Sequence, residues 1–306
     1  FVGPFMVNKA FGNPWDLSDL MSGLKVQVTT KEKARASDWH GQKANIFRVP
    51  NTSEHLSEFF DWIGHDLKDG NRVVQPVFVQ RFPPDYADIQ STTKRKELFV
   101  EIVLPLILRE NARILDQRVK IADLSRKSSL TDEEKNWLEY MYSKYRLEDQ
   151  KTFEALLYRV DVVPPGLALA PAANESAWGT SRFSRLGNAV YGQWTWSADD
   201  EGIVPLDRED NKSHRVKAFY QLYASVRSYM LNLNRHRSYE PFRQIRKVLK
   251  SRGQPLDSYK MAQGLIKYSI KREEYVTHLR SLLTQNDFAK YDDYVLNPYI
   301  EIPGQL

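Results

Sequence analysis

Apolar residues recur at helical spacing through most of the chain from Thr92 to about Asp287, and one short segment interrupts this pattern. That segment, Tyr191 to Asp207, is rich in Trp, Thr, Gly, Val and Asp, which favours a short β hairpin over a helix. Helices are predicted to resume near Ser213. The pattern therefore predicts a mainly α fold in which a helical lobe carries one small β-hairpin lobe.

Capping and breaking residues set helix boundaries in the first half of this pattern. The helix from Thr92 to about Ile121 contains Pro105, which should kink or break it locally, because proline lacks an N–H and its ring clashes with the preceding turn. Thr131 followed by Glu134 forms a capping box and predicts that a second helix begins there.

The chain before residue 85 has a different, mixed pattern. Gly23 to Thr30 alternates weakly as a strand does, a helix is predicted from about Ser53 to Leu67, and Val73 to Gln80 forms a second extended run. The double proline Pro83-Pro84 ends this part. We therefore predict a mixed α/β N-terminal extension and three parts in all: an accessory segment of unknown role (1–85), a main domain (86–290) and a C-terminal tail (291–306).

Missing residue types exclude several classes of site. The chain has no cysteine, which excludes disulfides, thiolate nucleophiles and cysteine-based zinc sites. Its six histidines form no His-x-x-x-His or His-Glu-x-x-His arrangement, and the sequence has no phosphate-binding glycine loop. We therefore expect neither a metal nor a cofactor.

The formal charge of +5 favours an anionic partner, which could be nucleic acid, a phospholipid surface or a cell wall. Basic residues are mostly interleaved with acidic ones, so no nucleic-acid partner is expected. The longest apolar run, Leu98 to Leu108, is interrupted by Glu101 and Pro105, so no transmembrane segment is expected. The first residue is Phe1 rather than Met, which fits a removed leader or a trimmed chain.

One further predicted helix has an unusual composition. Pro164-Pro165 suit its first turn, and Gly179 supplies a stop just after Trp178. The stretch LALAPAANESAWGTSRF, residues 167–183, covers most of this helix and the segment that follows it. It is the most informative part of the sequence.

Glu175 shares a face of this helix with the small apolar residues Ala168 and Ala172. A ligand or another segment can approach such a face closely. Desolvation there would raise the pKa of Glu175 and keep its carboxyl group protonated near neutrality, as a general acid requires. The alternative is a structural carboxylate paired with Arg182 or Arg185, which is the commoner role for an isolated acid.

Two linked motifs carry a family resemblance. They are AANESAWGTSRF (residues 172–183) and GNAVYGQW (residues 187–194). In this order they closely resemble the Bax-like branch of bacterial glucosaminidases, which is similar to the flagellar rod-cap hydrolase domain and to autolysin glucosaminidases. Further matches flank them: Leu104-Pro105-Leu106, Glu110-Asn111, Ile114-Leu115, Ser225 to Met230, Asn232 to Asn234, Tyr268-Ser269 and Glu274 to Val276.

The resemblance spans residues 82–285 and has two departures. Pro171 stands where a helix former such as Gln is usual, and Arg272 stands where a Gly is expected after Tyr268-Ser269. Neither position touches the acid, but the second puts the local turn in doubt.

The resemblance implies an endo-β-N-acetylglucosaminidase that cuts the glycan strands of peptidoglycan, with Glu175 protonating the glycosidic oxygen. It also implies a lysozyme-like fold, in which a helical lobe and a small β lobe face each other across a glycan groove, and a location in the periplasm or cell envelope. Two alternatives stay open. The chain could be a muramidase or lytic transglycosylase acting on the same polymer, or a wall-binding module that does not cut.

A glycosidase also needs a second carboxylate or the help of the substrate's own acetamido group. The predicted hairpin offers four acids: Asp199, Asp200, Glu201 and Asp207. Asp200 and Glu201 are the first candidates for a general base. If no acid reaches the site, the acetamido group is the natural nucleophile, and a tyrosine would position it.

Aromatic side chains gather around both motifs, and sugar rings stack on such side chains. Tyr191, Trp194, Tyr220 and Tyr229 are therefore predicted to bind substrate, together with Gln193, whose amide can pair with an acetamide. Core packing explains Trp178, on the predicted helix, better than binding does.

Overall fold

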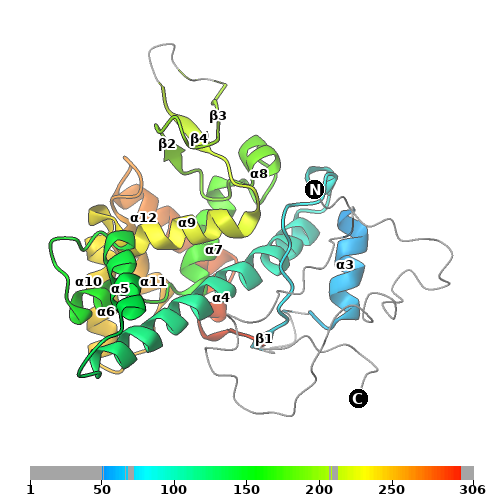
Figure 1. Ribbon diagram of the computed structural model, residues 1–306. Coiled ribbons are helices and arrows are strands. Elements are labelled where there is room, and N and C mark those ends of the chain that lie inside the picture. Colours follow the sequence, from blue (N-terminus) through cyan, green and yellow to red (C-terminus); the bar gives the residue numbers. More distant parts are fainter. Residues whose placement is uncertain are drawn as a thin grey trace.

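The computed structural model describes residues 50, 52–65, 67, 72–206, 208 and 213–297 (Figure 1). The predicted strand at residues 23–30 and the candidate acid Asp207 lie outside the described residues. Helices dominate, and two small sheets accompany them. The prediction of a mainly α fold with a small β lobe is confirmed.

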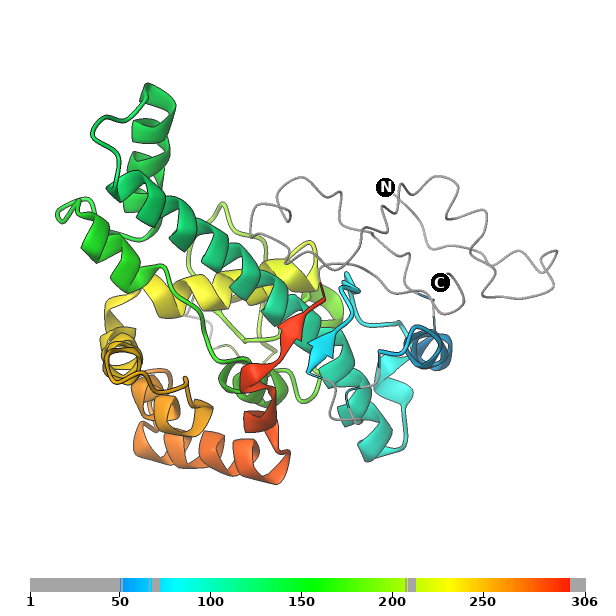
Figure 2. The same ribbon diagram turned by 90° about the horizontal axis from the view of Figure 1, so that it is seen from below.

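A long helix, α4 (Thr92–Ser125), crosses the helical lobe diagonally (Figure 2). Ser91 caps it by accepting a hydrogen bond from the backbone N–H of Lys94. Of the kink or break predicted at Pro105, the break is wrong, because α4 runs through this residue, and the kink stays a prediction. Pro105 and its neighbours are fully enclosed by the core, and tertiary packing of this kind overrides the helix-breaking tendency of a proline. The capping box of Thr131 and Glu134 is confirmed.

Eight described helices follow α4 in the chain. They are α5 (Asp132–Lys144), α6 (Phe153–Arg159), α7 (Pro165–Glu175), α8 (Arg182–Gly187), α9 (Leu222–Arg235), α10 (Glu240–Ser251), α11 (Ser258–Met261) and α12 (Glu273–Gln285), with short 3₁₀ turns η1 (Tyr86–Asp88), η2 (Arg237–Tyr239), η3 (Ala262–Leu265) and η4 (Phe288–Asp293). Helices α6, α7 and α9 pack against α4. Helix α7 also packs against α11, α12 and η4, and all its residues from Pro165 to Ala173 are buried. None of the described helices is long and apolar enough to cross a membrane.

Helix α7 begins at Pro165 as predicted but ends at Glu175, three residues before the predicted end. Ala177, Trp178 and Gly179 then have φ angles of 49°, 58° and 83°, in the left-handed region. The Ser176 hydroxyl donates to the carbonyl of Ala172 and accepts from the N–H of Gly179, so it closes the turn. The helix therefore stops directly after the residue predicted to be the acid.

The β lobe projects from the helical lobe (Figure 1) and consists of β2 (Trp194–Thr195), β3 (Gly202–Ile203) and β4 (Arg215–Lys217). The strands are antiparallel in the order β2-β4-β3, so the lobe is a three-stranded sheet and not the predicted hairpin. The predicted helix start near Ser213 is also wrong, because α9 begins at Leu222. Val216 is buried between two half-exposed neighbours, and this alternation is that of a strand.

The described part of the N-terminal extension packs onto the helical lobe. Helix α3 (Ser53–Trp62) is shorter than predicted, and its Leu56 and Phe60 enter the same core as α4. Strand β1 (Val73–Val74) pairs in parallel with β5 (Val295–Leu296), and Figure 2 shows the two side by side. The division of the chain at residues 85 and 291 stays a prediction, and this two-stranded sheet joins segments from both sides of it.

Arg272 occupies the position where the family resemblance suggests glycine, and its backbone explains why. It precedes α12 with φ 46° and ψ −108°, a combination that is costly for a residue with a Cβ. We expect Arg272→Gly to raise the free energy of unfolding by about 1 kcal/mol. Arg272→Ala is the matched control, since it removes the same side chain and keeps the strain. Urea denaturation of the three proteins checks this, and equal midpoints for the Gly and Ala variants would contradict it.

Candidate active site

Glu175 ends α7 at the edge of the core, with its side chain half-buried. Burial raises the pKa of Glu175, against the opposing effects of a hydrogen bond from Asn174 and of nearby His278. A raised pKa keeps a carboxyl group protonated to higher pH than in a free side chain. The position therefore suits a group that donates a proton.

The two carboxyl oxygens of Glu175 have different surroundings. The side-chain amide of Asn174 donates to Oε1 at 3.0 Å. Gly192 lies over Oε2, and a Cβ on this glycine would stand 3.6 Å from that oxygen. Gly192 has φ +55°, which favours glycine, so bare backbone faces Oε2. The arrangement leaves Oε2 as the oxygen free to carry the acidic proton.

A cluster of tyrosines lies beside the acid. The rings of Tyr191 and Tyr229 stack at 3.9 Å, Tyr268 meets Tyr229 edge-on at 6.0 Å, and Tyr275 stacks on Tyr268 at 5.2 Å. Burial raises the pKa of Tyr229, Tyr268 and Tyr275, and the negative charge of Glu175 adds to this effect. All three hydroxyls therefore stay protonated and can act as donors.

Three of these hydroxyl groups have unused hydrogen-bonding capacity. The Tyr268 hydroxyl donates to the carbonyl of Tyr191 at 2.8 Å. The hydroxyls of Tyr191, Tyr229 and Tyr275 are buried and have no hydrogen-bond partner among the described residues. Buried polar groups in native proteins are usually paired, so unpaired ones beside an acid point to a place for a polar ligand group or water.

The prediction that Tyr191 and Tyr229 contact sugar rings directly is wrong for the structure described. Their relative exposures are 1% and 0%, because each ring covers a face of the other. Both rings instead belong to the buried core.

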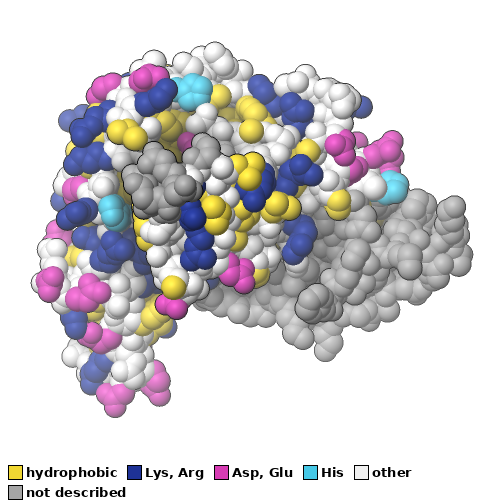
Figure 3. Space-filling view, turned by 90° about the horizontal axis from the view of Figure 1, so that it is seen from above, with side chains coloured by type: hydrophobic (Ala, Val, Ile, Leu, Met, Phe, Trp, Pro, Cys, Tyr) yellow, Lys and Arg dark blue, Asp and Glu magenta, His cyan; other side chains and the backbone are white. Residues whose placement is uncertain are grey.

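The exposed aromatic residues lie on and near the β lobe. Trp194, Trp196 and Tyr220 have relative exposures of 55%, 66% and 75%. Trp194 stacks on His214 at 4.3 Å and meets Trp196 edge-on at 6.0 Å. Figure 3 looks onto the face from which the β lobe projects, and shows hydrophobic side chains gathered near its centre with Lys and Arg around them. These rings are exposed, and the binding of substrate by Trp194 and Tyr220 stays a prediction.

Gln193 lies between the tyrosine cluster and the β lobe. Its backbone carbonyl accepts from the N–H of Lys217, which extends the pairing of β2 with β4. Its side-chain oxygen is buried without a partner among the described residues, so the predicted role in binding an acetamide stays open.

The acids of the β lobe differ in their contacts. The carboxylate of Asp200 accepts from Lys217 Nζ at 2.5 Å and from the Thr195 hydroxyl at 2.6 Å, and these bonds lower its pKa. Asp200 thus ties β2 to β4. Glu201 has an exposed side chain, and its backbone carbonyl accepts from Ala218 N–H. The contacts of Asp200 are those of a structural residue.

The structural alternative for Glu175, an ion pair with Arg182 or Arg185, is not found among the described residues. Arg182 donates instead to the carbonyl of Val204 in the β lobe, at 3.0 Å. Trp178 packs edge-on against Phe99 at 5.5 Å, with Lys96 over its ring, so its assignment to core packing is confirmed.

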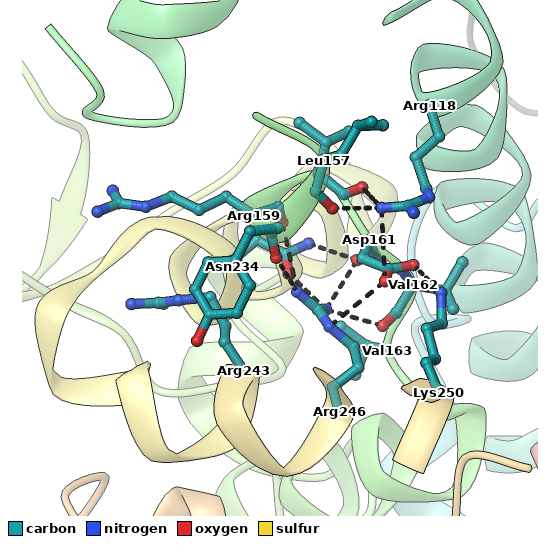
Figure 4. A network of polar contacts seen from close by, with 12 residues as sticks. Arg118, Leu157, Arg159, Asp161, Val162, Val163, Asn234, Arg243, Arg246 and Lys250 are labelled. Carbon is teal, nitrogen blue, oxygen red and sulfur yellow. Dashed lines mark hydrogen bonds and ion pairs between the residues drawn. The ribbon is translucent and has the colours of Figure 1, made fainter. Parts of the chain in front are cut away.

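A buried polar network anchors the chain where it enters α7 (Figure 4). The Asp161 carboxylate accepts two hydrogen bonds from Lys250, at 2.6 and 2.7 Å, and faces the guanidinium of Arg246. Arg246 Nη1 also donates to the Asp161 carbonyl and to Asn234 Oδ1. The side-chain amide of Asn111 donates to the carbonyl of Val163, and its oxygen accepts from the N–H of Val163. The network fixes the segment just before Pro165.

Sequence reasoning did not find this network, nor the contacts of Asn174 and His278. Asn111 lies 52 residues from Val163, and Asn174 lies 104 residues from His278, so no local spacing signals these contacts. The described residues contain no group of three or more His, Cys, Asp or Glu side chains arranged to hold a metal ion.

Comparison with known proteins gives three findings. A family model described as "Glucosaminidase: Mannosyl-glycoprotein endo-beta-N-acetylglucosaminidase" matches residues 150–288. Protein bax of Escherichia coli (strain K12) is 29% identical over 218 residues, which are 69% of this chain and 73% of that protein. Among solved structures, the catalytic domain of the autolysin Auto from Listeria monocytogenes matches with 14% identity and a TM-score of 0.33, covering 57% of this chain and 97% of that domain.

Proposed function

We propose that this chain is a glucosaminidase of the Bax-like branch, an endo-β-N-acetylglucosaminidase that cleaves the glycan strands of peptidoglycan with Glu175 as general acid. The observation that carries the proposal is the position of Glu175 at the end of α7, inside the family match, half-buried and with a raised pKa. Such a substrate implies a periplasmic or cell-envelope location.

The proposed chemistry uses one oxygen of the acid. Oε1 accepts the hydrogen bond from Asn174, and Oε2 carries the proton toward the side on which Gly192 leaves the backbone bare. Proton transfer to the glycosidic oxygen lets the bond to the anomeric carbon break as positive charge develops on the sugar. Glycan strands would be held by stacking on Trp194, Trp196 and Tyr220, which are exposed.

For the second group, the contacts favour the substrate's own acetamido group over a β-lobe acid. Asp200 is occupied by Lys217 and Thr195, and a carboxylate with a lowered pKa is a poor base. The hydroxyls of Tyr229 and Tyr275, in contrast, have no hydrogen-bond partner among the described residues, although they are buried and would have to be uncovered to meet a substrate. An acetamide carbonyl that attacks the anomeric carbon needs donors of this kind to orient it.

We therefore expect Asp200→Ala and Glu201→Ala each to retain activity within about tenfold of wild type, or about 1.4 kcal/mol of barrier. Asp200→Ala should also loosen the β lobe, because Lys217 loses its partner. Rates come from the clearing of a peptidoglycan suspension under saturating substrate. A loss of about 10²–10⁴-fold in either variant, without loss of binding to insoluble peptidoglycan, would identify a loop base and overturn this assignment.

The proposal itself is tested with the wild-type chain and purified, insoluble peptidoglycan. Clearing of the suspension together with sedimentation of the protein with the polymer is the expected result. Sedimentation without clearing or release of soluble fragments would show a wall-binding module that does not cut.

A further inference from the structure

His278 reaches the acid from a distant part of the chain. It lies on the exposed side of α12, one turn after Tyr275, and α12 packs against α7. Its Nε2 atom is 2.8 Å from Oδ1 of Asn174, and Asn174 Nδ2 in turn donates to Glu175 Oε1 at 3.0 Å. Two hydrogen bonds thus connect a solvent-exposed imidazole to the carboxyl group.

The donor in each of these two hydrogen bonds follows from the chemistry of Glu175 and His278, the two ends of the connection. A carboxyl oxygen that faces an amide nitrogen must accept, so the Asn174 carbonyl oxygen is turned toward His278. His278 then donates from Nε2, which it can do both as the Nε2–H tautomer and as the imidazolium. Without this donor, the Asn174 amide could rotate and present its oxygen to Glu175, and the hydrogen bond to Oε1 would be lost.

We propose that His278 and Asn174 are positioning residues that together orient the Glu175 carboxyl group and leave Oε2 as its proton-carrying oxygen. The catalytic consequence rests on the function proposed above, whereas the contact with the carboxyl group does not. Neither residue needs to touch the substrate.

The pair also stabilises the ionised form of Glu175. Burial raises the pKa of Glu175, and the hydrogen bond from Asn174 and the charge of His278 both lower it. The other titratable groups that face the acid are the hydroxyls of Tyr229 on α9, Tyr268 before α12 and Tyr275 on α12. These tyrosines are buried and stay neutral, so His278 is the titratable group with charge to contribute.

The direction of the effect follows from the role of Glu175. A general acid works when protonated, so activity falls as the pH rises through the pKa of Glu175. Removing the pair destabilises the carboxylate and raises that pKa further. The alkaline side of the kcat/KM profile should therefore move to higher pH.

The test measures the titration of Glu175 directly and its rate profile separately. Protein labelled with ¹³C at the glutamate carboxyl groups gives a titration curve for each, and Glu175→Gln identifies the Glu175 signal. The variants are Asn174→Leu, His278→Ala, the double variant and His278→Gln, which keeps a donor but not a charge. Thr277→Ala, an exposed neighbour on α12, is the matched control.

We expect the Glu175 midpoint to rise by about one pH unit in Asn174→Leu, since a hydrogen bond to a charged group is lost. His278→Ala should give a smaller rise, and His278→Gln a smaller one still, because it keeps the donor and loses only the charge. The double variant should rise by less than the sum of the two single shifts. The kcat/KM profiles should shift by the same amounts, with Thr277→Ala unchanged.

Unchanged midpoints in Asn174→Leu and His278→Ala would overturn the proposal, as would additive shifts in the double variant. A His278→Gln variant that matches His278→Ala would also overturn it, because charge alone would then explain the effect. Midpoints that shift as expected while Glu175→Gln retains activity would refute the proposed function of Glu175 and leave the positioning contact intact.

Discussion

Glu175→Gln is expected to lose activity on peptidoglycan by about 10²–10⁴-fold while the protein stays folded and binds the polymer. The amide has almost the shape of the protonated acid, and its oxygen can still accept the hydrogen bond from Asn174. It cannot release a proton to the glycosidic oxygen. The loss should therefore fall on kcat, because the exposed aromatic residues that would hold the glycan are untouched.

The control for Glu175→Gln is the same substitution at a glutamate that has no proposed function. Glu154, which is exposed on α6, provides it as Glu154→Gln. Initial rates of suspension clearing and thermal unfolding are measured for wild type and both variants. Activity of Glu175→Gln near the wild-type level, with Glu154→Gln as reference, would show that another group protonates the leaving oxygen.

Asp161→Ala is expected to lower the free energy of unfolding by about 3–5 kcal/mol, the usual cost of removing one partner from a buried ionic network. The carboxylate is buried and contacts Lys250, Arg246 and Arg118. Burial lowers the pKa of Arg246 to about 10, and the charge of Asp161 is the largest effect that opposes this shift. Without Asp161 the buried guanidinium loses the carboxylate that it faces.

The measurement for Asp161→Ala is the unfolding midpoint, which should fall by about 5–8 °C for a chain of this size. Asp149→Ala, at an exposed position before α6, is the control and should stay within about 0.5 kcal/mol of wild type. Because the network holds the segment before Pro165, activity of Asp161→Ala should also decline at temperatures well below its midpoint. Equal midpoints for the two variants would contradict this account of how α7 is anchored.

Much of the helical architecture is predictable from the sequence because its signals are local. The capping box at Thr131, the proline start of α7 and the apolar faces of the long helices depend on residues within a few positions of each other. The errors arose where distant contacts decide. Pro105 stays inside α4 because the core encloses it, and β4 forms because β2 and β3 pair with it on both sides.

The candidate site was predictable at its centre and not in its surroundings. The motif around Glu175 and its apolar helix face indicate a desolvated acid, and the raised pKa agrees with this expectation. Aromatic composition could not separate buried from exposed rings, so Tyr191 and Tyr229 were grouped with Trp194 and Tyr220. His278 lies 104 residues from Asn174, and only the packing of α12 on α7 brings them together.

The most direct test of the central claim is mass spectrometry of the fragments released from purified peptidoglycan by the wild-type chain, with Glu175→Gln as the parallel reaction. The account predicts soluble fragments that end in reducing N-acetylglucosamine, produced by wild type and nearly absent with the variant. Fragments that end in reducing muramic acid or in anhydromuramic acid would contradict the proposed bond and identify a muramidase or a lytic transglycosylase. Equal yields from wild type and Glu175→Gln would contradict the assignment of the acid.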